Sequence, residues 1–241
     1  MWVICRKEWQ QFFSSWSNYI VLAVFLMLCG VIFFVLPDTS LLDFGYAGLD
    51  SFFALAPLIL LFLVPAITMR SLSEEYKSGT IELLKTLPFT NRQIVWGKYM
   101  GALIILLAAL LPTTIYAFSM QQLSATGGID VGAAIGSYIG LYLLGAVFAA
   151  AGICAGSFSQ HTIVAFATAA LLCIILYSGF DAISKLPVFT SKGWDYYVQM
   201  LGAAFHYRHI SRGVIDVRDL IYFVGLIALF LFITQKKLET I

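Results

Sequence analysis

The stretch FFALAPLILLFLVPAITMRSLSEEYKSGTIELLKTLPFTNRQIVWGKYM runs from Phe52 to Met100. Its first part, residues 52–69, is apolar and uncharged, whereas residues 70–98 mix basic, acidic and polar side chains. An uncharged apolar run of about 20 residues is long enough to cross the hydrocarbon core of a bilayer as a helix. The stretch therefore predicts a membrane span, a polar connection, and a second span that begins near Tyr99.

The same pattern extends along the whole chain. Hydrophobic residues make up 61% of the 241 residues and charged residues 11%, against about 45–50% and about 25% in soluble domains. Six spans are predicted, at residues 19–36, 52–69, 99–118, 135–156, 162–180 and 220–234. We therefore expect an all-α membrane protein with six transmembrane helices, in which residues 1–241 form a single membrane domain.

The segment before the first span, residues 1–18, predicts an amphipathic helix that lies in the membrane interface. Its aromatic residues recur at helical spacing, and its basic residues fall on the opposite face. The aromatic residues are Trp2, Trp9, Phe12, Phe13 and Trp16, and the basic residues are Arg6 and Lys7. Tryptophan favours the interface, and lysine and arginine can bind anionic headgroups there. An ordinary cytosolic lead-in helix is the alternative.

Basic residues near the span ends predict the orientation. Lysines and arginines concentrate before the first span, between the second and third, and after the last, so both termini are expected in the cytoplasm. Residues 181–219, on the outer side, have mixed charge, and their apolar part leaves open whether the loop is re-entrant. His206 and His209 could share a helix face, but too few ligands accompany them to favour a metal site. Asp219 is expected to be solvated at the outer interface.

The cytoplasmic segment 70–98 contains strong local signals for short, ordered helices. Ser71 with Glu74 and Thr90 with Gln93 have capping-box spacing, so we expect a helix to begin at each. Gly79 permits a turn between them. Thr80 can cap a further short helix that Pro88 ends. A stiff helix presented in this way suits a membrane protein driven by a cytosolic motor, although an ordered loop without a partner would show the same signals.

Small residues and prolines predict how the spans pack. G-x-x-x-G pairs include Gly97 with Gly101, Gly136 with Gly140, and Gly152 with Gly156. Such pairs let helices approach closely, within the chain first and between subunits second. Three prolines, Pro57, Pro65 and Pro112, lie within spans and free backbone carbonyls that neighbouring helices or hydroxyl groups must satisfy.

No phosphate-binding G-x-x-x-x-G-K-[ST] motif occurs in the sequence. Motifs of zinc proteases and serine hydrolases are absent as well. We therefore expect no enzyme activity, no metal and no cofactor in this chain, and no nucleic-acid partner is indicated by its net charge of +1. Any motor that drives it must be another polypeptide.

The run TMRSLSEEYKSGTIELLKTLPFTNRQIVWGKYMG resembles the signature of ABC-2 type permeases. The matching positions are Met69, Arg70, Glu74, Glu75, Gly79, Thr80, Glu82, Leu84, Pro88, Gly97 and Lys98. KEWQQFFSSW is similar to the elbow helix of that family, and SRGVIDVRDLIYF to the stretch that leads into its last span. Within the family, the chain looks closest to the gliding-motility permease of the GldF kind.

This resemblance implies a permease of the bacterial inner membrane, multi-pass, that takes part in export. It implies a separate ATPase dimer of the GldA kind, which binds ATP and Mg, and a second membrane subunit of the GldG kind or a homodimer. It also implies that a coupling helix contacts the ATPase through Arg70, Glu74, Glu75, Gly79, Thr80, Glu82, Leu84 and Pro88. The alternatives are the permease of a copper-related maturation complex, and a membrane anchor or scaffold of a motility or secretion machine without transport of its own.

Overall fold

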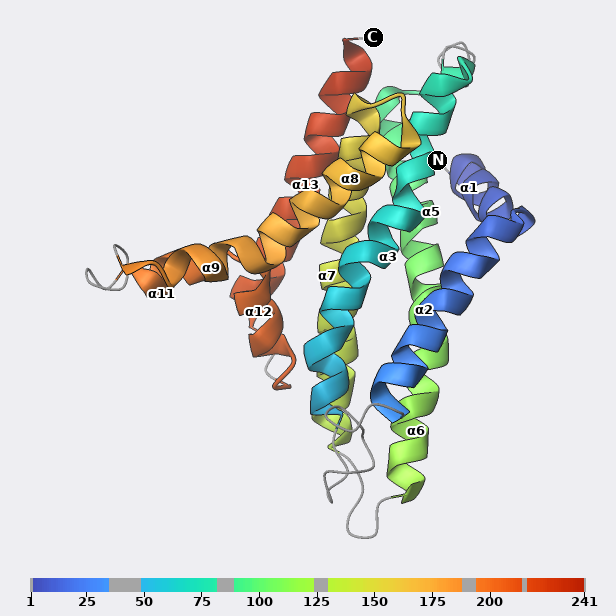
Figure 1. Ribbon diagram of the computed structural model, residues 1–241. Helices are drawn as coiled ribbons and strands as arrows, with labels where there is room; N and C mark the ends of the chain where they lie inside the picture. Colours follow the sequence, from blue (N-terminus) through green and yellow to red (C-terminus); the bar gives the residue numbers. More distant parts are fainter. Residues whose placement is uncertain are drawn as a thin grey trace.

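The computed structural model describes residues 2–34, 49–81, 89–123, 130–187, 194–213 and 216–240 (Figure 1). The helices begin with α1 (Trp2–Ser14), α2 (Trp16–Phe34), α3 (Asp50–Lys77) and α5 (Asn91–Leu110). The 3-10 turn η1 (Leu111–Thr113) joins α5 to α6 (Thr114–Leu123), and α7 (Val131–Phe158) follows. The π-helical turn η2 (Ile175–Gly179) joins α8 (Thr162–Ile174) to α9 (Phe180–Ser184), and α11 (Asp195–Met200), α12 (Ala203–Ile210) and α13 (Val217–Glu239) complete the described chain.

Five of these helical segments are long and apolar enough to cross a membrane: Asp50–Lys77, Asn91–Gln122, Val131–Phe158, Thr162–Ser184 and Val217–Glu239. A sixth crossing is possible if the bent pair Trp2–Ser14 and Asn18–Phe34, whose axes differ by 74°, is one span. The prediction of an all-α membrane protein is confirmed. Apart from the first predicted span, residues 19–36, each predicted span lies within one of these five segments.

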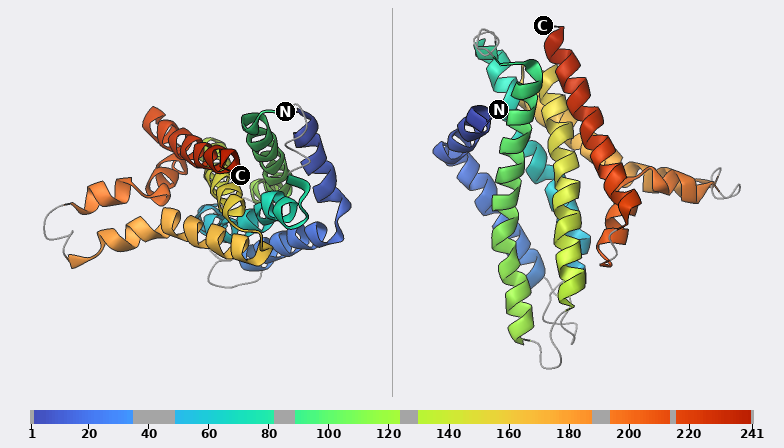
Figure 2. Two further views of the ribbon diagram at one scale, coloured as in Figure 1. Left: turned by 90° about the horizontal axis from the view of Figure 1, so that it is seen from above. Right: turned by 180° about the vertical axis from the view of Figure 1, so that it is seen from behind.

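Helix α7 is the central element of the bundle, and α3, α5, α8 and α13 pack around it (Figures 1 and 2). Its glycines make this packing close. A Cβ atom at Gly152 would lie 2.0 Å from Oγ1 of Thr68 on α3, and one at Gly145 would lie 2.7 Å from a methyl group of Leu106 on α5. Close van der Waals contact is what holds helices together where lipid surrounds them.

The other glycine pairs also pack within the chain. Gly136 and Gly140 of α7 lie against Ile210 and Gly213, at the end of α12. Gly101 of α5 lies against Glu8 of α1, so that a Cβ atom there would come within 2.8 Å of Cβ of Glu8. The prediction that such pairs serve packing within the chain is confirmed at these positions.

One proline-freed carbonyl receives its hydrogen bond from another helix. Pro57 has no N–H, so the carbonyl of Phe53, four residues earlier, lacks the usual helical donor. The hydroxyl of Tyr207 on α12 donates to that oxygen at 2.7 Å. Pro112 marks the point where the third span changes from α-helix to the 3-10 turn η1.

The predicted helix start at Ser71 is wrong, because α3 continues without a break from Asp50 to Lys77. Ser71 is an interior residue of that helix, and its hydroxyl contacts Oε2 of Glu8 on α1 instead of capping. The helix ends at Lys77, and Gly79, two residues later, has a φ of +71°, the left-handed conformation that glycine adopts without strain. The predicted turn at Gly79 is confirmed.

The second capping box is confirmed. Thr90 accepts a hydrogen bond from the N–H of Gln93, and the Gln93 side chain accepts one from the N–H of Thr90, so α5 begins there. Thr80 and Ile81 are helical, and the rest of the predicted second short helix lies outside the described residues. Pro88, the predicted end of that helix, also lies outside the described residues.

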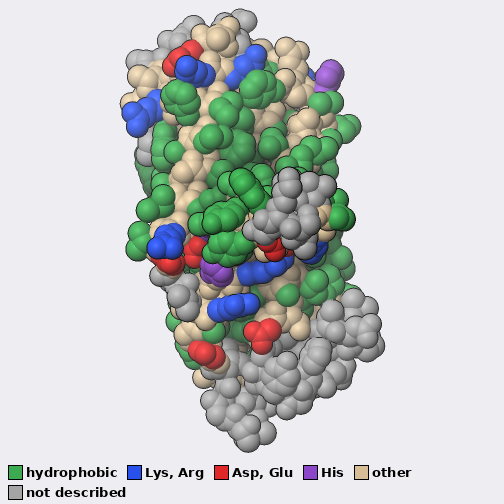
Figure 3. Space-filling model, turned by 90° about the vertical axis from the view of Figure 1, so that its left-hand side faces the viewer, with side chains coloured by type: hydrophobic (Ala, Val, Ile, Leu, Met, Phe, Trp, Pro, Cys, Tyr) green, Lys and Arg blue, Asp and Glu red, His purple; other side chains and the backbone are tan. Residues whose placement is uncertain are grey.

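Both termini lie at the same end of the bundle, here called the N/C end (Figure 1). Helices α9 and α11, here called the lateral arm, project sideways from the bundle, while α12 lies against it (Figures 1 and 2). Figure 3 shows a broad band of apolar side chains between charged groups at the N/C end and a second belt of charged groups at the level of the arm. Neither α11 nor α12 is long enough to cross a bilayer.

Candidate functional site

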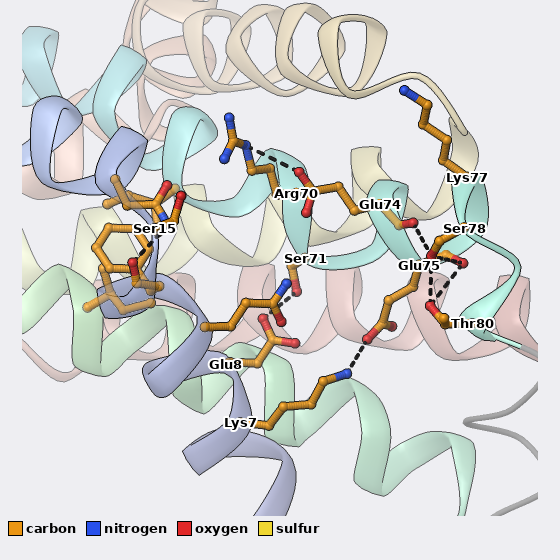
Figure 4. Close-up of a pocket in the computed structure, with 15 residues that line it drawn as sticks. Lys7, Glu8, Ser15, Arg70, Ser71, Glu74, Glu75, Lys77, Ser78 and Thr80 are labelled. Carbon is orange, nitrogen blue, oxygen red and sulfur yellow. Dashed lines mark hydrogen bonds and ion pairs between the residues drawn. The ribbon is translucent and has the colours of Figure 1, made fainter.

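A cleft of about 680 Å³ opens at the N/C end between α1 and the last turns of α3 (Figure 4). Polar and charged side chains make up most of its wall. They are Lys7, Glu8, Gln11, Ser15, Asn18, Arg70, Ser71, Glu74, Glu75, Lys77, Ser78 and Thr80, with Phe12, Ile67 and Ile105 at the apolar floor. The cleft therefore lies next to the segment that the sequence predicts as the coupling element.

Beneath the cleft, four charged side chains from three helices form one cluster, here called the four-charge cluster: Lys7, Glu8, Glu75 and Lys98. The Lys98 side chain is fully buried, and its Nζ lies 2.7 Å from Oε1 of Glu8 and 2.9 Å from Oε2 of Glu75. Lys7 Nζ lies 2.9 Å from the other oxygen of Glu75. Two lysines and two glutamates cancel in charge, so the cluster satisfies the rule that buried charges are paired.

The cluster fixes α1 to both helices that flank the coupling segment. Glu8 is on α1, Glu75 is near the end of α3, and Lys98 is in the second turn of α5. Lys98 also donates to the backbone carbonyl of Ser71, which ties α5 to α3 a second time. Gly101 allows this arrangement because a side chain at that position would occupy the space of Glu8.

The two adjacent glutamates of the predicted coupling segment have different surroundings. Glu75 is only 8% exposed and points into the cluster. Glu74 points into the cleft and pairs with Arg70 one turn earlier at 3.3 Å, and both side chains are well exposed, at 41% and 38%. Of the pair, Glu74 is therefore the carboxylate that a partner protein could reach.

The remaining predicted coupling residues divide into two groups. Gly79 lies in the exposed turn after α3 and Thr80 directly follows it, with Thr80 Oγ1 2.8 Å from the hydroxyl of Ser78. Glu82, Leu84 and Pro88 lie outside the described residues. The structure thus brings Arg70, Glu74, Glu75, Gly79 and Thr80 together at one end of α3.

The predicted interfacial helix forms as α1, and its residues divide by burial. Phe12 is buried, Trp9 and Phe13 pack partly against the core with ring centroids 4.4 Å apart, and Trp2 and Trp16 are 73% and 86% exposed. Arg6 is exposed. Lys7 contributes to the four-charge cluster instead of remaining free for headgroups.

Sequence reasoning missed Glu8 as a site residue and gave Lys98 no role. A signal was present for Glu8, because it lies three residues after Cys5 and four before Phe12, both of which are buried. A charge on the buried face of an amphipathic helix requires a partner elsewhere in the fold. The partner could not be identified from the sequence, because Lys98 is 90 residues away.

The expectation that Asp219 is solvated is wrong. Asp219 is 2% exposed, because α12 packs across the first turn of α13, and its Oδ1 lies 2.6 Å from Nδ1 of His206. Asp181 is 22% exposed and pairs with Lys185 at 2.8 Å and Arg208 at 3.8 Å. Within the described residues, no group of three or more His, Cys, Asp or Glu side chains is arranged to hold a metal ion.

The helical bundle, its spans and its paired charges at one end define a multi-pass membrane protein. Residues 2–192 match the sequence model of the ABC-2 family transporter protein, so the chain belongs to that family. The match covers α1, α3 and α5, which carry the four-charge cluster. A search of curated proteins found no match to this chain.

Membership in the family has a direct functional meaning. The chain is a permease subunit of an ABC transporter, and in this family the ATPase resides in a separate subunit. An ABC ATPase is therefore implied as a partner.

Proposed function

We propose that this chain is the membrane-spanning half of an ATP-driven ABC-2 exporter in the bacterial inner membrane. Both termini are cytoplasmic, and motion of the ATPase enters at the N/C end through residues 70–98 together with α1. The four-charge cluster carries this proposal, because its ion pairs join α1, α3 and α5 next to the exposed Arg70–Glu74 pair.

The length of α3 supports the transmission of motion. A continuous helix of 28 residues is about 42 Å long at about 1.5 Å per residue, whereas the hydrocarbon core is about 30 Å thick. A displacement at Gly79 therefore reaches the far end of the bundle without passing through a loop. Tyr207 and Thr68 connect the same helix to α12 and α7, so the motion extends to the outer half.

We further propose the partners and the biological role that the sequence resemblance indicates. These are an ATPase dimer of the GldA kind that binds ATP and Mg, a second membrane subunit of the GldG kind or a second copy of this chain, and a role in gliding motility or protein secretion. The permease of a copper-related maturation complex, and a scaffold without transport, remain the competing assignments.

Purification of the tagged chain from native membranes in mild detergent, followed by mass spectrometry, tests this set of proposals. A stoichiometric ABC ATPase supports the coupling proposal, and the identity of any second membrane subunit decides between the gliding-motility and copper-related assignments. ATP hydrolysis that a candidate substrate stimulates favours transport over a scaffold role. Reproducible absence of any ATPase would overturn the proposal.

A charge reversal at Glu74 tests the docking surface directly. Glu74→Lys places a second cation beside Arg70 on the exposed wall of the cleft, so we expect several-fold less co-purified ATPase with unchanged membrane insertion. Glu239→Lys is the matched control, because it makes the same change at an exposed residue of the N/C end on α13. Equal ATPase recovery in both variants would show that the cleft is not the docking surface. Glu82→Lys extends the test to a position outside the described residues.

A further inference from the structure

A second buried ionisable pair lies away from the cleft, where α12 meets the first turn of α13. Nδ1 of His206 is 2.6 Å from Oδ1 of Asp219, and the two side chains are 4% and 3% exposed. The proposed coupling route uses neither residue. A buried acid and base in contact need a physical account of their own, because burial of unpaired charge is costly.

The hydrogen-bond partners of His206 determine how many protons the pair holds. Nε2 lies 2.8 Å from the backbone carbonyl oxygen of Met200. A carbonyl oxygen only accepts, so Nε2 must carry a hydrogen. Nδ1 faces a carboxyl oxygen, so this second contact is a hydrogen bond only if one more proton lies between Nδ1 and Oδ1. The pair holds that proton as imidazolium with carboxylate or as imidazole with carboxylic acid, and the proton count is the same in both.

The surroundings provide little other compensation for charge on Asp219. Its second oxygen, Oδ2, is buried and has no hydrogen-bond partner among the described residues. Asp219 lies in the first turn of α13, where the helix dipole favours negative charge. Of the other ionisable groups in the described chain, only His209 comes within ion-pair distance of Asp219, with its Nδ1 3.9 Å from Oδ1.

The neighbouring charged and titratable groups have partners elsewhere. Arg208 faces Asp181 of the lateral arm at 3.8 Å. Asp216 accepts a hydrogen bond from the backbone N–H of Arg218. Tyr222 stacks on the imidazole of His206 with ring centroids 3.9 Å apart. The Tyr222 hydroxyl donates a hydrogen bond to the backbone carbonyl of Leu201. Tyr222 therefore covers one face of the His206 imidazole.

The pair joins α12 to the last span, and two further hydrogen bonds between α12 and the bundle are donated by hydroxyl groups. Tyr207 donates to the carbonyl of Phe53 on α3 at 2.7 Å. Ser137 of α7 donates to the carbonyl of Ser211, directly after α12, at 2.8 Å. Unlike these two hydrogen bonds, the short His206–Asp219 contact depends on a shared proton, and His209 lies farther from Asp219, at 3.9 Å.

We propose that His206 and Asp219 form a proton-binding site that holds α12 against α13. With one proton between Nδ1 and Oδ1, the two helices are joined by a short, charge-assisted hydrogen bond. Loss of that proton leaves the imidazole with one hydrogen for two acceptors, the carboxylate of Asp219 and the carbonyl of Met200. One of the two contacts then sets a lone pair of the ring against an oxygen, so the hold on α12 weakens. This inference does not depend on the proposed function, because it concerns a contact within the chain.

The pH dependence of thermal unfolding of the purified chain in detergent tests the site. Asp219→Asn replaces the acid with an amide, whose N–H can donate to Nδ1 and makes the extra proton unnecessary. We expect the unfolding temperature of the wild type to fall more steeply at alkaline pH than that of Asp219→Asn. Asp181→Asn, which removes a carboxylate from the same part of the fold, should keep the steep fall. Parallel curves for the wild type and Asp219→Asn would overturn the proposal.

Nitrogen-15 NMR of ring-labelled histidine provides a second readout, the protonation of each ring nitrogen. A contact with a purely structural role would leave that protonation unchanged. The chain has three histidines. His161, which is exposed, and His209, which is half-buried, are assigned by substitution with Gln. We expect His206 to carry a hydrogen on Nε2 and a shared proton on Nδ1 at neutral pH, and to lose the Nδ1 signature in Asp219→Asn. A His206 ring that titrates like His161 and His209 would contradict the inference.

Discussion

At the scale of single residues, the site depends on charges that are buried and paired. Lys98 is fully buried with two carboxylates within 2.9 Å, whereas Lys7 is 48% exposed. The same residue type therefore contributes differently at the two positions. A buried charge that loses its partners destabilises the fold strongly, while an exposed ion pair contributes about 1 kcal/mol or less.

Lys98→Met should reduce the free energy of unfolding by about 3 kcal/mol or more, because it leaves Glu8 without its cation and leaves the buried Glu75 with Lys7 alone. Reversible unfolding in mixed detergent micelles measures this. Lys7→Met removes the exposed cation of the same cluster and should cost about 1 kcal/mol or less. Similar costs for the two variants would show that burial does not distinguish the two lysines.

At the scale of helices, close approach depends on positions without side chains. Helix α1 rests on α5 at Gly101, and α12 rests on α7 at Gly136 and Gly140. In each case the contact places a functional side chain: Glu8 in the four-charge cluster, and His206 beside Asp219. The glycines therefore contribute to both sites without any chemistry of their own.

Gly101→Ala should loosen α1, because the added Cβ would lie 2.8 Å from Cβ of Glu8, and overpacking of this kind costs about 1–3 kcal/mol. Hydrogen–deuterium exchange over residues 2–14 should be faster in the variant. Gly225→Ala on α13 is the matched control, since a Cβ there meets no atom within 4 Å. Unchanged exchange in Gly101→Ala would mean that α1 does not depend on this contact.

At the scale of the whole molecule, the bundle has two chemically different ends. The N/C end carries the cleft, the four-charge cluster and the lysines of the last turn of α13. The charged belt at the level of the lateral arm lies beyond the apolar band (Figure 3). An apolar band between two polar regions is what a bilayer requires of a protein that crosses it.

The proposed orientation predicts which end a membrane-impermeant maleimide can reach. Ser78→Cys lies at the exposed turn of the N/C end, and Val131→Cys lies at the opposite end, where Val131 is 47% exposed. The four native cysteines are buried and should not react. We expect Ser78→Cys to be labelled only in inverted vesicles and Val131→Cys only in right-side-out vesicles. The reverse pattern would show that the positive-inside assignment is wrong.

Local sequence signals predicted much of the fold. The apolar runs predicted five of the observed segments, the Thr90 and Gln93 capping box predicted the start of α5, and Gly79 predicted the end of α3. The similar signal at Ser71 failed, because a helix that already has its hydrogen bonds on both sides has no free N–H groups to cap. A capping motif indicates a helix start only where the chain has another reason to begin one.

The sequence by itself determined the class of the protein, the approximate limits of five of its apolar helices, and the position of the charged segment that follows the second predicted span. These features depend on neighbouring residues and on the thickness of a bilayer. Only the tertiary structure decided which charges pair. Glu8 meets Lys98 across 90 residues, and His206 meets Asp219 across 13, with a turn and a helix start between them. Such pairs depend on how the glycine-lined helices pack, and side-chain periodicity along one helix carries no information about its partner.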